Sequence, residues 1–131
     1  MNYFNELLEI NKIITNDDDN VRLENLEGVY QLLDTFNRSP FNLDEFIKLC
    51  ILLFNMQIFY DGNSRTVLAY LVKKIDKNGY TMDIETATKG LIKLKGLFPL
   101  MYDLTEELDY HEIEKIRANI SKKKVKVRDN E

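Results

Sequence analysis

The sequence predicts an all-α domain, a single bundle of about six helices. Apolar residues recur every three or four positions in six separate segments, which is the spacing of amphipathic helices. The chain contains only five Gly and two Pro, fewer than the many turns of a β-sandwich require. Its 131 residues are 44% hydrophobic and 31% charged, which is the size and composition of one globular domain.

Two helices are expected before Pro40. The first covers residues 3–14 and ends at residues 16–20, a run of Asn and Asp that favours turns and helix caps. The second covers residues 21–36, where Val21, Val29 and Leu33 share one face. Residues 37–42 then form a connection, because Pro40 disfavours helical backbone at the preceding Ser39.

The third and fourth helices have clear end signals. Asn42 is a good N-cap residue, and Glu45 occupies the capping-box position three residues later. Residues 46–54 are apolar except for Lys48, so this helix is expected at the centre of the bundle. The fourth helix begins near Ser64, and Asn78-Gly79 is expected to end it in the left-handed conformation.

A fifth helix is expected over residues 83–95 and a sixth over residues 105–120. The domain then covers residues 1–121, and residues 122–131 form a charged, solvated tail. This tail holds five of the 18 basic residues but two of the 22 acidic ones, so residues 1–121 carry a net charge of −7. Such an acidic body is poorly suited to nucleic-acid phosphates.

Cysteine content and hydropathy argue against several other classes of protein. Cys50 is the single cysteine, which excludes an internal disulfide and a cysteine-based zinc site, and its apolar neighbours predict a buried side chain. The longest apolar run, residues 49–54, is far shorter than a membrane span, and the acidic, polar-interrupted start does not resemble a secretory signal. We therefore expect a cytoplasmic protein that binds neither membranes nor nucleic acid.

Residues 57–68, with the sequence QIFYDGNSRTVL, carry the strongest functional signal. They place an acid, a glycine and an asparagine directly before a helix whose first turn holds Arg65. Free backbone N–H groups at a helix N-terminus and an Arg side chain suit a phosphate group, and Asp61 would suit a divalent cation. In a purely structural alternative, Asp61 and Asn63 cap the helix and Arg65 points to solvent. Spacing alone leaves both interpretations open.

This segment resembles the Fic/Doc signature, His-x-Phe-x-Asp/Glu-Gly-Asn-x-Arg-x-x-Arg. Phe59, Asp61, Gly62, Asn63 and Arg65 match it at the correct spacing, between two predicted helices, and the similarity covers residues 43–82. The resemblance implies a protein that binds ATP with Mg²⁺ and transfers AMP, or phosphate in Doc-type members, to a hydroxyl side chain of a target protein.

The resemblance also assigns roles within the motif. Asp61 takes the metal position, and Phe59 anchors the loop in the core. Gly62, Asn63 and the backbone N–H groups of Ser64 and Arg65 form the phosphate cradle, and Arg65 contacts the outer phosphates.

The resemblance further implies a target-docking flap that contains Ser39, Pro40 and Phe41. In the family such a segment is extended and aligns a loop of the target protein, so a groove is expected between it and Gln57. Main-chain hydrogen bonding to an extended edge is physically reasonable here. Phe41 has an equally plausible structural role, as a hydrophobic staple in front of the Asn42 cap.

Two departures from the signature bear on activity. Gln57 stands at the position of the catalytic His, and an amide can orient a hydroxyl but cannot accept its proton. Leu68 stands where many members have a second Arg, which Doc-type members also lack. His111, the single histidine, lies among acidic residues, and we expect it on a helix surface. Two functions follow: a weakened transferase, or a pseudoenzyme or helical module that binds a target protein or an antitoxin-like partner without catalysis.

Overall fold

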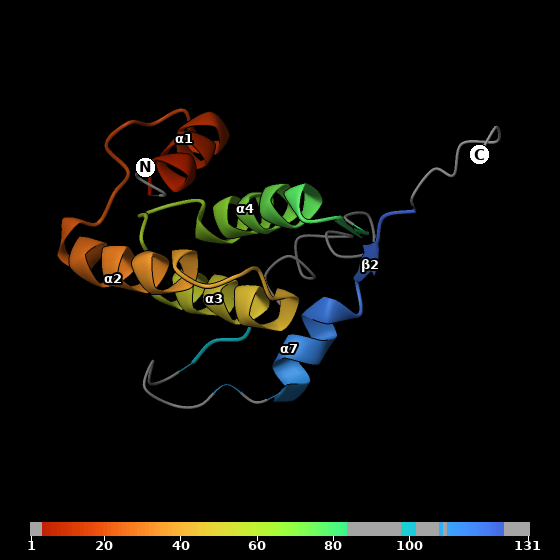
Figure 1. Cartoon of the computed structure of the whole chain (residues 1–131). Helices are drawn as coiled ribbons and strands as arrows, with labels where there is room; N and C mark the ends of the chain where they lie inside the picture. Colours follow the sequence, from red (N-terminus) through yellow and green to blue (C-terminus); the bar gives the residue numbers. More distant parts are fainter. Residues whose placement is uncertain (1–3, 84–97, 102–107, 109, 125–131) are drawn as a thin grey trace.

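A computed structural model describes residues 4–83, 98–101, 108 and 110–124 of the chain (Figure 1). Helices account for 63% of these residues, and the described part also contains one small sheet of two strands, so the structure is mostly helical and compatible with the all-α class. The described residues contain five α-helices where about six were expected: α1 (Phe4–Thr15), α2 (Leu26–Asn37), α3 (Leu43–Asn55), α4 (Asn63–Lys77) and α7 (Tyr110–Arg117). The helix expected over residues 83–95 lies outside the described residues, apart from Asp83.

The third helix forms the centre of the fold, as its apolar sequence predicts. α3 packs against α2, α4 and α7, and α1 packs across α4 (Figure 1). More than half of the α3 side chains are buried: Phe46, Ile47, Leu49, Cys50, Ile51, Leu53 and Phe54. A helix in contact with neighbours on several sides buries residues all round, which explains why its sequence lacks a polar face. Among the described helices, none is both long and apolar enough to cross a membrane.

The N-terminal end of α3 is built as expected. The Asn42 Oδ1 atom accepts a hydrogen bond of 3.1 Å from the Glu45 backbone N–H. The Phe41 ring packs on Phe46, with 5.6 Å between ring centroids, which is the hydrophobic staple. At the end of α4, Gly79 has φ +87°, so this helix also stops in the predicted left-handed manner.

The second helix begins later than predicted. Val21 forms an antiparallel bridge with Phe59, and the Arg22 backbone N–H donates to the Ile58 carbonyl at 2.7 Å. A 3₁₀ turn, η1 (Leu23–Asn25), then leads into α2. An apolar residue just before a helix suits either an extended or a helical backbone, so periodicity assigned Val21 to the wrong element.

The C-terminal region differs from the prediction as well. α7 ends at Arg117, and residues expected at the end of the sixth helix and in the tail form strand β2 (Ile120–Lys122). β2 pairs antiparallel with β1 (Tyr80–Met82), with Thr81 opposite Ser121. The Lys123 backbone N–H then donates to the Gly79 carbonyl at 2.9 Å. The ordered pairing therefore continues past the predicted boundary at residue 121, while residues 125–131 lie outside the described part.

Candidate functional site

The candidate site is built around the α3–α4 loop, residues 56–62. Gln57, the second residue of the loop, lies in the left-handed region at φ +49°, and Gly62, the last residue, is also left-handed at φ +80°. Between these two bends, Phe59 is buried in the core, as the motif implies. The bridge to Val21 and a 2.9 Å hydrogen bond from the Tyr60 N–H to the Asn20 carbonyl fix the outer edge of the loop.

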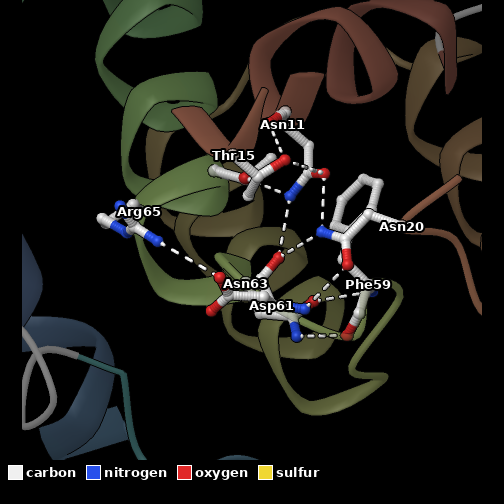
Figure 2. Close-up of polar contacts among 8 residues, drawn as sticks. Asn11, Thr15, Asn20, Phe59, Asp61, Asn63 and Arg65 are labelled. Carbon is white, nitrogen blue, oxygen red and sulfur yellow. Dashed lines mark hydrogen bonds and ion pairs between the residues drawn. The ribbon is translucent and has the colours of Figure 1, made fainter. Parts of the chain in front are cut away.

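Two buried amides, Asn11 and Asn20, hold the Asp61 backbone (Figure 2). Asn20 donates to the Asp61 carbonyl at 2.7 Å and accepts from the Asp61 N–H at 3.2 Å. Asn11, on α1, donates to the same carbonyl at 3.0 Å and to the Thr66 hydroxyl at 3.1 Å, and accepts from Asn20 at 2.9 Å. The two side chains are only 1% and 5% exposed, so these bonds are shielded from water.

Sequence reasoning missed these two residues. One available signal was the position of Asn11 on α1, where it shares the buried face with Phe4 and Leu7. A polar residue on an apolar helix face needs a buried hydrogen-bond partner, although the sequence does not identify that partner. For Asn20, within a run of turn-forming residues, the sequence carries no comparable signal.

Asn63 holds the other half of the loop. Its Oδ1 atom accepts from the Phe59 N–H at 2.9 Å, and its Nδ2 atom donates to the Phe59 carbonyl at 2.6 Å. The same Nδ2 atom also donates to Gln57 Oε1 at 3.3 Å. The amide of Asn63 is thus engaged inside the loop, so an anion cradle here consists of backbone N–H groups and Arg65, without this side chain.

Gln57 is occupied by the same internal contacts. Its Nε2 atom donates to the Phe54 carbonyl at 2.8 Å, while Oε1 accepts from Asn63. Its own carbonyl accepts from Asn25 Nδ2 at 3.4 Å. Gln57 therefore satisfies a carbonyl at the C-terminal end of α3, and its amide supplies no base.

Asp61 and Arg65 are the charged groups exposed at this site. The Arg65 side chain is 49% exposed and the Asp61 side chain 76%, with 3.9 Å between Arg65 Nη2 and Asp61 Oδ2. Figure 2 shows the two side chains pointing toward each other, while the Asp61 carbonyl faces the amides of Asn11 and Asn20. The backbone of Asp61 is thus fixed by hydrogen bonds to buried amides, whereas its carboxylate is exposed and makes only a long ion pair.

The N-terminus of α4 has no side-chain cap. Gly62 is the N-cap residue, so neither Asp61 nor Asn63 caps the helix as the structural alternative proposed. A Cβ atom at Gly62 would lie 2.9 Å from Thr15 Cγ2 and 3.6 Å from Arg65 Nη2. Glycine is needed here both for its positive φ and for this close approach. Ser64, in the first turn, is partly buried.

The structure does not bring the expected flap to this site. Ser39, Pro40 and Phe41 lie in irregular backbone just before α3, whereas Gln57 follows that helix. A helix of 13 residues is about 20 Å long, so the two lie at opposite ends of it. The expected groove between the flap and Gln57 is therefore not formed, and Phe41 instead takes the staple position described above.

The other reactive side chains lie apart from the loop. Cys50 is fully buried in α3, and this burial raises the pKa of its thiol, which makes it a poor nucleophile. His111 is exposed on α7, where its Nδ1 atom lies 4.0 Å from Glu114. Within the described residues, no three His, Cys, Asp or Glu side chains are grouped to hold a metal ion.

Comparisons with known proteins do not assign this chain to a family. No family model matches this chain, and no curated protein or solved structure matches it significantly. The resemblance to the Fic/Doc family therefore stays a prediction, which depends on the motif in residues 57–65.

Proposed function

We propose that this chain is a Fic/Doc-like protein that binds the phosphates of a nucleotide, with ATP as the first candidate, at the N-terminus of α4. The observation that carries this proposal is the combination of an uncapped helix N-terminus, a left-handed Gly62 and an exposed Arg65 at one point. Free N–H groups and the helix dipole attract an anion, and a guanidinium group binds phosphate through two hydrogen bonds.

The side chains also suit Mg²⁺ that arrives with a nucleotide. Mg²⁺ keeps several waters and takes one or two protein carboxylates together with phosphate oxygens. Asp61 supplies one exposed carboxylate beside the proposed phosphate site. Its pair with Arg65 is long and solvated, so separating the two groups costs little.

Gln57 favours binding without efficient transfer. General-base assistance contributes about 10²–10⁴-fold to a proton-transfer step, and the amide of Gln57 cannot provide it. Its hydrogen bonds to Phe54 and Asn63 also keep it within the loop. We therefore rank a weakened AMP or phosphate transferase alongside a pseudoenzyme that binds a target or antitoxin-like protein without catalysis.

Calorimetry with ATP and Mg²⁺ tests the binding proposal. We expect the wild-type protein to bind ATP and Arg65→Ala to bind at least tenfold more weakly, since it loses a charge-assisted pair. Arg38→Ala is the matched control, because Arg38 is an exposed arginine on the C-terminal side of α2 that pairs with Asp34. Absence of wild-type binding, or equal affinity in Arg65→Ala, would refute the proposal.

Transfer of label to protein separates the two functions, with α-³²P-ATP reporting transfer of AMP and γ-³²P-ATP reporting transfer of phosphate. We expect wild-type transfer near background and partial recovery in Gln57→His, provided that both bind ATP. If Gln57→His still transfers nothing while ATP binds, the pseudoenzyme is the better description. Efficient wild-type transfer that survives Gln57→Ala would show that another group removes the proton.

A further inference from the structure

A separate pocket lies at the opposite end of α3 from the α3–α4 loop. It has a volume of about 360 Å³ and is bounded by the end of α2, residues 39–42, the first turns of α3 and the second half of α4. Its apolar wall consists of Phe36, Phe41, Phe46, Leu49 and Tyr70. This size and lining are typical of small-molecule sites.

Three of the four aromatic rings of this wall are in contact: the Phe46 centroid lies 5.6 Å from that of Phe41 and 5.8 Å from that of Tyr70. The face of an aromatic ring carries partial negative charge, so such a wall binds both apolar groups and cations.

The charges around the pocket favour a cation. Lys74 contributes to the lining, but its ammonium lies 2.9 Å from Glu6 in a mostly buried ion pair, which neutralises it. The same ammonium lies 5.7 Å from the centroid of the Tyr70 ring, so the rings open to a ligand are those of Phe41 and Phe46. Glu45 lies at the exposed rim, and among the described residues it has no ion pair. The C-terminal ends of α2 and α4, at Asn37 and Asn78, add two negative ends of helix dipoles, against the one positive end of α3 at Asn42. The remaining charge at the opening is therefore negative.

We propose that this pocket binds a small molecule that combines one apolar ring with a primary ammonium group. The ring lies against Phe41, Phe46 and Leu49, and the ammonium group points to the rim, where Glu45 is its counter-ion. The proposal is independent of the nucleotide site, because the pocket shares no lining residue with the α3–α4 loop.

Three probes with one ring and different charges test this proposal in the full-length protein. They are 2-phenylethylammonium, 2-phenylethanol and phenylacetate, each titrated into ¹⁵N-labelled protein and followed by amide chemical shifts. We expect saturable shifts at Phe41, Glu45 and Tyr70. The cation should bind about threefold more tightly than the alcohol, as exposed charge pairs typically allow, and phenylacetate should bind most weakly.

The Glu45→Gln variant tests the contribution of the ammonium group to binding separately from that of the ligand's ring. It keeps the backbone N–H that Asn42 caps, so we expect it to fold, and the cation should bind it no more tightly than the alcohol. Glu9→Gln, an exposed change on α1 outside this pocket, should leave the preference intact. The proposal fails if the pocket amides do not shift, if phenylacetate binds as tightly as the cation, or if Glu45→Gln retains the preference.

Discussion

Replacing Asn11 by alanine tests whether the buried amides hold the α3–α4 loop in place. The substitution removes three hydrogen bonds of 2.9–3.1 Å, which join α1 to Asp61, Thr66 and Asn20. Each contributes about 1 kcal/mol net in a buried setting, so the expected loss of unfolding free energy is about 3 kcal/mol. With a urea m-value of about 2 kcal/mol/M, the unfolding midpoint should fall by about 1.5 M.

Asn5→Ala is the matched control for this experiment. Asn5 lies on the same helix but is exposed, so its replacement should change the unfolding free energy by less than about 0.5 kcal/mol. Asn20→Ala and the double variant complete a cycle, and we expect a coupling of about 1 kcal/mol or more, because both amides bind the Asp61 carbonyl.

Amide hydrogen exchange shows which part of the protein loses stability in Asn11→Ala. The Tyr60 and Asp61 N–H groups donate to Asn20, which Asn11 supports, so both should exchange faster in Asn11→Ala. If Asn11→Ala is as stable as Asn5→Ala and the exchange rates are unchanged, the two amides do not hold the loop and this account of the site is wrong.

Three further predictions concern single positions. Position 57 has left-handed backbone, which glycine adopts more easily than alanine. Gln57→Ala should therefore have an unfolding free energy about 1 kcal/mol lower than Gln57→Gly in urea unfolding, and a Gln57→Ala variant that is the more stable of the two would contradict this. Asn42→Ala should lose about 1 kcal/mol by the same assay, whereas Asn42→Asp keeps the cap, and equal losses would exclude the capping role. Burial raises the pKa of the Cys50 thiol, so the folded state keeps a proton that the unfolded state loses above about pH 9. Between pH 9 and 10 the unfolding free energy should fall by about 1 kcal/mol more in the wild type than in Cys50→Ala, and parallel curves would contradict it.

The sequence was sufficient for the parts of the fold that local signals determine. Asn42 and Phe41 define the start of α3 through a cap and a staple within a few residues, and Gly79 ends α4. It was insufficient where the partner is distant in the chain. The strand at Ile120 pairs with a segment some 40 residues earlier, and a three-residue strand has no periodicity to detect.

The candidate site shows the same division. The motif implied that Phe59 anchors the loop, and Phe59 is buried in the core. The exposed pair between Arg65 and Asp61 was not predicted, because the motif assigned Arg65 to a ligand. The motif also did not predict that Asn63 bonds to the Phe59 backbone, since an amide can face a ligand or its own loop with equal chemical ease. Nor did it reveal Asn11, whose partner Asp61 lies 50 residues away.

The loop combines a firmly held backbone with a loosely held charged pair. The Asp61 backbone has three bonds to buried amides, whereas its carboxylate meets Arg65 only across 3.9 Å at the exposed surface. The proposed phosphate binding therefore needs only a reorientation of Arg65, which exposed pairs allow at a cost of about 1 kcal/mol or less. Reorganisation of the backbone would break buried hydrogen bonds and cost several times more. Under the proposed binding mode, ATP should therefore leave the hydrogen-exchange rates of the Tyr60 and Asp61 amides unchanged, and a large change in either rate would contradict it.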